Sequence, residues 1–256
     1  MAEKPLQFGT VSNAVRIENT IHRDTGVWTP TIHALIAYLN ENGFTEAPKV
    51  LGFDEKGREI LSFLPGTEAS RPWPNILRQS GGLYQAGRML RRYHDIITNF
   101  KPSAEAEWRI GEVELKPGQI IRHGDLGPWN TIWQNDTLTG LIDWDFAQPG
   151  DRLEDLAQMA YYFIPLRSEE GWRKAGFEKC PNFAERLNIL VSSYGMYSVD
   201  ELVGAVLVQQ DQERKLVIKK AAQNIEPWIT FMKRGDVEES LKDTAWLRAI
   251  KADILT

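Results

Sequence analysis

The chain has 256 residues, of which 42% are hydrophobic and 25% charged, as expected for a globular protein with a sizeable core. Its 30 basic and 35 acidic residues give a net charge of -5, which argues against nucleic-acid partners, and no apolar run is long enough for a membrane span. The single cysteine excludes an internal disulfide, and the first residues lack the apolar stretch of a signal peptide, so we expect a cytoplasmic protein with a small-molecule partner.

Short strands around one helix are predicted in the first part of the chain. Alternating apolar and polar residues predict a hairpin over 14–23 with Asn19 at its turn. Apolar residues recur at helical spacing over 29–43, with Pro30 near the start of the helix. A second hairpin is predicted where "DEKG" joins two apolar stretches, and it ends at the chain-breaking pair Pro65-Gly66.

Helical periodicity dominates the chain beyond Pro74. Apolar residues spaced three and four apart predict helices over 76–97, 153–163, 183–194, from 199 into the 220s, and from 237 to about 250. The exception lies between the first two, where "TIWQ" and "GLIDW" predict a short hairpin that turns at "NDTLTG".

Polar residues that suit phosphate chemistry surround this hairpin. The stretch "HGDLGPWN" precedes it and "LIDWDFA" closes it, so the hairpin would bring Asp125 and Asn130 close to Asp143. Oxygen ligands from Asp and Asn suit Mg²⁺, which usually takes one or two carboxylates together with substrate phosphates. A carboxylate that does not bind the metal could orient a hydroxyl group and accept its proton during phosphoryl transfer.

These two motifs resemble the catalytic signature of the aminoglycoside phosphotransferase family, small-molecule kinases that share the protein kinase fold. The resemblance implies Asp125 as the catalytic base, with Asn130 and Asp143 as Mg²⁺ ligands. It also implies that His123 braces the loop and that Asp155 caps the following helix. The sequence leaves no room for a long activation loop, which favours a small-molecule kinase over a protein kinase.

The resemblance is weaker on the nucleotide side. "EILSFLPG" resembles the last small-lobe strand and the hinge, which implies that backbone groups of Ser62, Phe63 and Leu64 contact the adenine of ATP. Arg23 stands where the family has a phosphate-holding lysine, and an arginine is not equivalent to this compact point charge. Gly9 is alone in the stretch expected to cover the phosphates.

Two more features of the sequence bear on function. The helix that should offer a glutamate partner to the basic residue has Ile32 and His33 at about that position, so the usual ion pair is altered or lost. The stretches "VWTPTIHALIAYL", "GREILSFLPG" and "RHGDLGPWN" resemble a bacterial subgroup that includes trifolitoxin immunity proteins. This second resemblance implies a role in self-protection or detoxification.

The predicted fold is α+β: a two-lobed protein-kinase-like fold with a small antiparallel sheet and one helix in the first lobe, and a mostly helical second lobe. We expect residues 1–65 to bind the nucleotide and residues 66–256 to carry the catalytic and substrate sites. The predicted activity is transfer of the γ-phosphoryl group of ATP, with Mg²⁺, to a hydroxyl of a small molecule such as an aminoglycoside, sugar or amino alcohol.

Other interpretations of the same residues remain open at this level. Asp125 is also a common turn former, Asp143 also suits a strand end, and Arg23 also suits a solvated strand. Asp145 is either a metal or substrate contact or an ordinary surface carboxylate. The altered ion pair favours a second hypothesis, a degenerate kinase fold used as a binding or immunity module. A third is a metal-dependent hydrolase that uses Asp125, Asp143 and Asp145.

Overall fold

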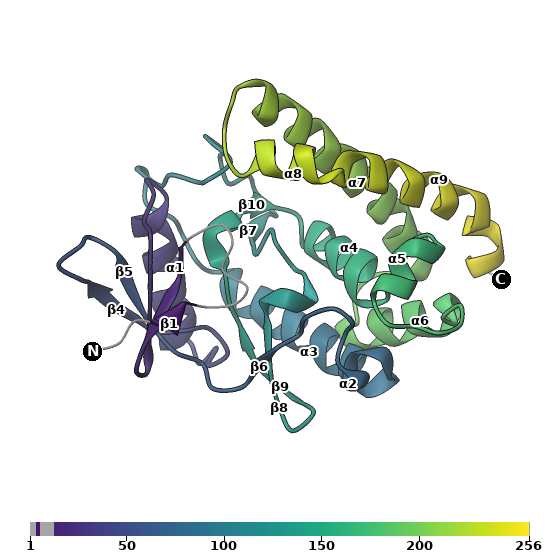
Figure 1. Cartoon of the computed structure of the whole chain (residues 1–256), viewed down its shortest axis with the longest axis horizontal. Coiled ribbons are helices and arrows are strands. Elements are labelled where there is room, and N and C mark those ends of the chain that lie inside the picture. The colour runs from purple at the N-terminus through teal and green to yellow at the C-terminus, as the bar shows by residue number, and fades with distance from the viewer. Residues whose placement is uncertain (1–3, 6–12, 256) are drawn as a thin grey trace. The chain divides into compact units, whose positions relative to one another are not determined.

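The computed structural model describes residues 4–5 and 13–255, whose helices and strands are drawn in Figure 1. These residues form two compact units. Gly9, predicted to contact the nucleotide, lies outside the described residues. Unit 1 contains the chain up to Ala69 together with Arg92–Asp125 and Trp129–Arg152. Unit 2 contains Ser70–Arg91, Leu126–Pro128 and the chain from Leu153 onward. These units are discontinuous in sequence, and the predicted lobe boundary at residue 65 stays a prediction.

An antiparallel sheet with strand order β1-β2-β3-β5-β4 forms one part of unit 1. Its strands are β1 (Lys4–Pro5), β2 (Val15–Ile17), β3 (Thr20–Arg23), β4 (Val50–Phe53) and β5 (Glu59–Ser62). The two predicted hairpins are therefore present, with turns at Glu18-Asn19 and over 54–58. Pairing of β3 with β5 joins the hairpins and sets Arg23 directly opposite Glu59.

Helix α1 (Thr29–Glu41) supplies the apolar core beside this sheet. It confirms the helix predicted from the spacing of apolar residues, because Ile32, Leu35, Ile36 and Leu39 are all fully buried. The same unit contains a cluster of packed rings, in which Tyr93 lies 5.7 Å from Phe44 and 5.1 Å from Trp144 between ring centroids.

Two small sheets complete unit 1. One has the order β6-β8-β9 and the other pairs β7 with β10. The strands are β6 (Thr67–Glu68), β7 (Ile120–Arg122), β8 (Thr131–Gln134), β9 (Thr137–Leu141) and β10 (Gln148–Gly150). The predicted hairpin is β8–β9, but its turn is tighter than predicted: only Asn135 and Asp136 connect the strands, and both have positive φ angles, as type I′ hairpin turns require.

Most of the helices lie in unit 2. They are α2 (Asn75–Arg78), α3 (Ser80–Ile97, whose residues from Arg92 belong to unit 1), α4 (Arg152–Phe163), α5 (Glu169–Lys174), α6 (Phe183–Tyr194), α7 (Val199–Ala222), α8 (Trp228–Arg234) and α9 (Asp236–Leu255). Helices α7, α8 and α9 pack against one another (Figure 1). None of the helices in the described part of the chain is both long and apolar enough to cross a membrane.

The structure corrects the prediction of one continuous helix over 76–97. Gln79 is extended, with φ -95° and ψ 164°, and separates α2 from α3. A side chain at Gly82 would meet the carbonyl oxygen of Ile76 at 2.3 Å, so the glycine allows the two helices to form a close corner. The apolar periodicity continues through this corner, which is why the spacing alone did not reveal it.

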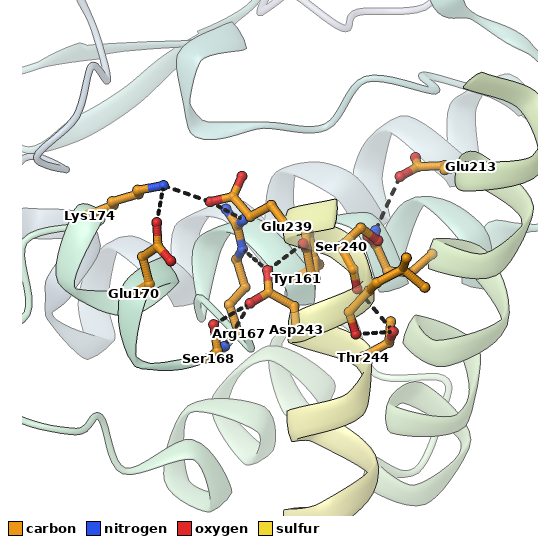
Figure 2. Close-up of polar contacts among 12 residues, drawn as sticks. Tyr161, Arg167, Ser168, Glu170, Lys174, Glu213, Glu239, Ser240, Asp243 and Thr244 are labelled. Atoms are coloured by element: carbon orange, nitrogen blue, oxygen red, sulfur yellow. Dashed lines mark hydrogen bonds and ion pairs between the residues drawn. The ribbon is translucent and has the colours of Figure 1, made fainter. Parts of the chain in front are cut away.

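A buried polar cluster ties α9 to the connection between α4 and α5 within unit 2 (Figure 2). The Asp243 carboxylate accepts hydrogen bonds from the Tyr161 hydroxyl at 2.7 Å, from Arg167 Nε at 2.7 Å, and from the Ser168 amide and hydroxyl at 3.0 and 2.6 Å. One turn earlier, Glu239 lies 3.0 Å from Arg167 Nη2. Asp243 is therefore a buried charge with full hydrogen bonding.

Candidate active site

The loop that carries Asp125 is shaped by Gly124. This glycine follows β7 with a φ angle of 78°, a conformation that residues with a side chain rarely adopt. A Cβ atom there would lie 2.2 Å from the carbonyl oxygen of Phe146, in the short 3₁₀ helix η2 (Trp144–Phe146). Glycine therefore allows the Asp125 loop to pass directly against the segment that follows Asp143.

His123 connects the two motifs from within the core. Its side chain is fully buried, and its Nε2 lies 3.1 Å from the carbonyl oxygen of Ile142, the residue before Asp143. The Asp125 amide donates to His123 Nδ1 at 3.3 Å, which fits a neutral imidazole that donates through Nε2. The ring also lies 4.6 Å from that of Trp144. These contacts support the bracing role predicted for His123.

Asn130 and Asp125 are in direct contact. Asn130 closes the 3₁₀ helix η1 (Pro128–Asn130), and its Nδ2 donates to the backbone and carboxylate oxygens of Asp125, both at 2.8 Å. The β8–β9 hairpin then returns the chain to this point, where the Ile142 amide donates to the Asn130 carbonyl at 2.9 Å. The structure thus brings the segment of Asp143 beside the loop of Asp125, as the hairpin predicted.

Asp143 has an unusual backbone and a partly accessible side chain. Its φ and ψ angles, 60° and 68°, place it in the left-handed region rather than at the end of a strand. The carboxylate is 34% exposed, against 5% for Asp145. The β6 residue Glu68 interacts with it: burial raises the pKa of Glu68, and the charge of Asp143 raises it further. Glu68 carries no motif and was not predicted.

Arg23 is the centre of the charged part of the site. It is 6% exposed, which rules out the solvated strand residue considered from the sequence. Its Nε donates to Glu59 at 2.5 Å, its Nη2 to Asp145 at 2.6 Å and its Nη1 to Asp143 at 3.0 Å. Burial alone would lower the pKa of Arg23, but the carboxylates of Asp145, Asp143 and Glu59 together raise it, so the guanidinium stays charged.

Arg23 does have a carboxylate partner, although this partner is not on the helix. Glu59 takes this position from the neighbouring strand β5, and its second oxygen lies 2.7 Å from His33 Nε2 on α1. Sequence reasoning missed Glu59 because Arg23 is 36 residues away and the pairing of β3 with β5 is not local. Alignment of the two predicted hairpins in antiparallel register is the signal that could have revealed it.

Asp145 is held between two arginines. It is 4% exposed, so it is not an ordinary surface carboxylate. One oxygen accepts from Arg23 and the other from Arg109 Nη1 at 2.8 Å. The Arg109 guanidinium also lies over the rings of Trp28 and Phe146, at 4.6 and 4.9 Å from their centroids. Burial raises the pKa of Asp145, which the charges of Arg23 and Arg109 oppose. Arg109 was not predicted either.

The remaining predicted residues are placed as follows. The amides of Ser62 and Phe63 donate to the carbonyls of Lys49 and Asn19, at 2.8 and 2.9 Å, and so are already used within the sheet. These two amides are therefore not available to donate to adenine, and a backbone hydrogen bond from this stretch would have to involve Leu64 or carbonyl oxygens. Asp155 is fully buried in the first turn of α4, inside the helix rather than at its N-cap. Its predicted capping position is therefore corrected.

The hypothesis of a metal-dependent hydrolase depends on the oxygens of Asp145. Within the described residues, no three or more His, Cys, Asp or Glu side chains are arranged to hold a metal ion. The third hypothesis required Asp145 as one of three metal-binding carboxylates, and both of its oxygens instead accept from guanidinium groups. The geometry therefore gives that hypothesis no support.

Comparison with known proteins agrees with the motifs. The sequence profile of the phosphotransferase enzyme family matches residues 105–179, a range that contains Asp125, Asn130 and Asp143. The trifolitoxin immunity protein of Rhizobium leguminosarum bv. trifolii is 33% identical over 234 residues, which cover 87% of this chain and 88% of that protein.

Solved kinase structures share the fold at low sequence identity. An amicoumacin kinase in complex with AMP-PNP, Ca²⁺ and Ami has a TM-score of 0.65 at 11% identity, covering 94% of this chain and 88% of that one. The Plasmodium vivax ethanolamine kinase gives 0.63 at 12%, covering 93% and 81%. An aminoglycoside 2'-phosphotransferase in complex with GDP gives 0.60 at 13%, covering 98% and 93%. The chain has the protein-kinase-like fold of these enzymes and belongs to the phosphotransferase enzyme family.

Proposed function

We propose that this protein is an ATP-dependent phosphotransferase that moves the γ-phosphoryl group to a hydroxyl of a small molecule. Aminoglycoside-like compounds, sugars and amino alcohols are the proposed acceptors, and self-protection or detoxification is the proposed role. We also propose a cytoplasmic location, as expected from the single cysteine and from the first residues of the sequence.

One observation carries this proposal: Asn130 Nδ2 donates to the Asp125 carboxylate at 2.8 Å, and Asp143 follows Ile142, whose amide is bonded to Asn130. The Asn130 amide thus holds the Asp125 carboxylate in position, and a positioned carboxylate can accept a proton from an acceptor hydroxyl. In phosphoryl transfer the protein contributes mainly by positioning the reactants and by neutralising charge, and this arrangement suits both tasks.

The residues present fit Mg²⁺ as the metal. Because Nδ2 of Asn130 faces Asp125, its other polar atom, Oδ1, is the one that would bind the ion, together with the partly exposed carboxylate of Asp143. An amide oxygen and a carboxylate are ligands that Mg²⁺ accepts alongside phosphate oxygens and waters. When bound, the ion would neutralise the charge that develops on the phosphates.

The test is an ADP-release screen of purified protein, ATP and Mg²⁺ against a library of hydroxylated metabolites and antibiotics. We expect turnover with at least one acceptor, and we expect Asp125→Asn to lower kcat about 100-fold or more, since a positioned general base contributes 10²–10⁴-fold. Asp136→Asn, the same change at the β8–β9 turn, is the matched control and should keep wild-type turnover. Equal activity of Asp125→Asn and wild type would contradict the assignment of Asp125.

A second candidate, a binding or immunity module without phosphotransfer, is favoured by one contact. Arg23 Nη1 lies 3.0 Å from Asp143, where a guanidinium competes with a metal ion for the carboxylate. The 33%-identical relative is itself called an immunity protein. Thermal unfolding with and without millimolar Mg-ATP separates the two: a kinase is stabilised by its nucleotide, whereas an unchanged melting temperature favours the binding module.

A further inference from the structure

A continuous chain of charged contacts crosses unit 1 through Arg23. It begins at Arg109, whose Nη1 donates to Asp145 at 2.8 Å, and continues from Asp145 to Arg23 at 2.6 Å. From Arg23 it passes to Glu59 at 2.5 Å and ends at His33, 2.7 Å from the second Glu59 oxygen. Nitrogen groups and carboxylates alternate along it, so each carboxylate lies between two nitrogen groups.

Glu59 supplies the carboxylate partner of Arg23, and His33 holds that carboxylate. The carboxylate that pairs with Arg23 comes from β5, directly opposite Arg23 in the sheet, instead of from α1. Helix α1 contributes the imidazole that fixes the other carboxylate oxygen. The Glu59 side chain is only 2% exposed, so its orientation is set by these two contacts and not by solvent.

Three nitrogens of Arg23 contact three different carboxylates at the same time. Nε donates to Glu59 and Nη2 to Asp145, both of which are buried, whereas Nη1 donates to Asp143, whose side chain is 34% exposed. Nη1 is therefore the nitrogen that a phosphate beside Asp143 could reach. The ammonium group of a lysine is a compact point charge and cannot span carboxylates held on opposite sides of a planar fork. The two fixed contacts therefore explain why an arginine stands here.

We propose that Glu59 and His33 are positioning residues that hold Arg23 for binding of the nucleotide phosphates, and that the site requires arginine at position 23. This inference rests on the proposed phosphotransferase function, and it concerns the orientation of Arg23 rather than the chemistry at Asp125.

The first test replaces Glu59 and compares it with a glutamate of the same hairpin. Glu59→Gln removes a charged hydrogen bond, so we expect the dissociation constant of Mg-ATP, measured by titration calorimetry, and the KM for ATP to rise roughly 10-fold to 100-fold. The kcat should change less. Glu55→Gln alters an exposed residue in the β4–β5 turn and should bind as wild type does.

The second test uses two substitutions at His33. His33→Gln keeps an N–H group that can donate to Glu59, whereas His33→Leu removes it. We expect near wild-type ATP affinity for His33→Gln and an affinity close to that of Glu59→Gln for His33→Leu. Both changes remove the ring, so a purely structural role of the imidazole would weaken the two variants equally. If Glu59→Gln fails to fold, these two His33 variants still test whether the contact with Glu59 supports ATP binding.

The third test asks whether Glu59 acts through Arg23. Arg23→Lys should weaken Mg-ATP binding about as much as Glu59→Gln, and the double variant should be no weaker than the weaker single variant. Additive losses, or wild-type affinity in Arg23→Lys, would overturn the inference. Wild-type protein that neither binds Mg-ATP nor turns it over would overturn the proposed function as well, whereas an active wild type with unchanged Glu59→Gln overturns the inference alone.

Discussion

At the scale of residues, the Asp54 carboxylate holds a turn of the backbone through several hydrogen bonds. Its Oδ1 accepts from the amides of Lys56 and Arg58, and its Oδ2 from Arg58 Nε, at 2.8–2.9 Å. The same Oδ2 lies 2.9 Å from Nδ1 of His22, the residue before Arg23. Asp54 therefore fixes the β4–β5 turn and ties it to β3, which helps to keep Glu59 opposite Arg23.

Asp54→Asn should destabilise the protein in a pH-dependent way. Burial alone would raise the pKa of Asp54, but the contacts with His22, Arg58 and Lys56 hold it well below its usual range. A carboxylate with a lowered folded-state pKa contributes stability above its unfolded pKa of about 3.9, and loses that contribution as the pH falls further. We expect a lower free energy of unfolding for Asp54→Asn at neutral pH and a shrinking difference below about pH 3.9, measured by urea denaturation.

A difference between wild type and Asp54→Asn that stays constant at all pH values would contradict this role. Glu55→Gln, one position along the same turn, should unfold as wild type does at every pH.

The residues predicted to be catalytic or metal-binding lie together, as the sequence indicated, whereas Glu59 and Arg109 beside them were not predicted. Asp125, Asn130 and Asp143 stand in a spaced motif, and one local hairpin brings them together. Glu59 and Arg109 reach the site through pairing and packing between distant segments, which leave no local pattern. Their assignments as catalytic, metal and positioning residues remain predictions until the variants are measured.

At the scale of elements, two places where one backbone segment lies directly against another determine where a helix or a loop begins. The α2–α3 corner at Gln79 depends on Gly82, and the loop after β7 depends on Gly124. A Cβ atom built on either glycine would lie within 2.3 Å of a carbonyl oxygen. Apolar spacing reports which face of a helix is buried, but it does not report such approaches. This is why the spacing predicted the long helices but not the corner, and the short helices α5 and α8 were not predicted.

Gly124→Ala should damage both stability and activity. Alanine would have to adopt a positive φ angle and would also clash with the Phe146 carbonyl, so the Asp125 loop must move. We expect a loss of roughly 1–3 kcal/mol or more in the free energy of unfolding, together with a loss of phosphotransfer.

Gly118→Ala provides the matched control for this element. Gly118 also has a positive φ angle, 85°, but nothing lies within 4 Å of a Cβ atom built there. Gly118→Ala should therefore lower the free energy of unfolding only through backbone strain, by about 1 kcal/mol. Equal effects of the two substitutions in urea denaturation would show that the contact with Phe146 is unimportant.

At the scale of the whole molecule, the fold was predictable because one motif identifies the family, whereas the compact units could not be derived from sequence order. Unit 1 includes the hairpins of the first 69 residues and also the segments with Asp125 and Asp143. All residues of the charged chain through Arg23 are therefore members of one unit.

Stability of unit 2 should depend strongly on Asp243. Asp243→Asn leaves the buried Arg167 without its shortest ion pair, and breaking a buried pair costs about 3–5 kcal/mol. For a chain of this size that corresponds to a decrease in Tm of roughly 6–20 °C by calorimetry. Asp211→Asn, which disrupts a half-exposed pair with Lys215, should lower Tm by no more than a few degrees. A similar Tm for both variants would show that Arg167 is adequately held by Glu239.

The left-handed backbone of Asp143 has an evolutionary consequence. A non-glycine residue in this conformation gives up about 1 kcal/mol of stability that glycine would keep. Glycine would remove this strain but also the contact with Arg23 Nη1, so aspartate persists there while its carboxylate is useful. Among descendants of this chain, position 143 is where a loss of phosphotransfer would become visible, because the substitution that ends the chemistry also removes the backbone strain.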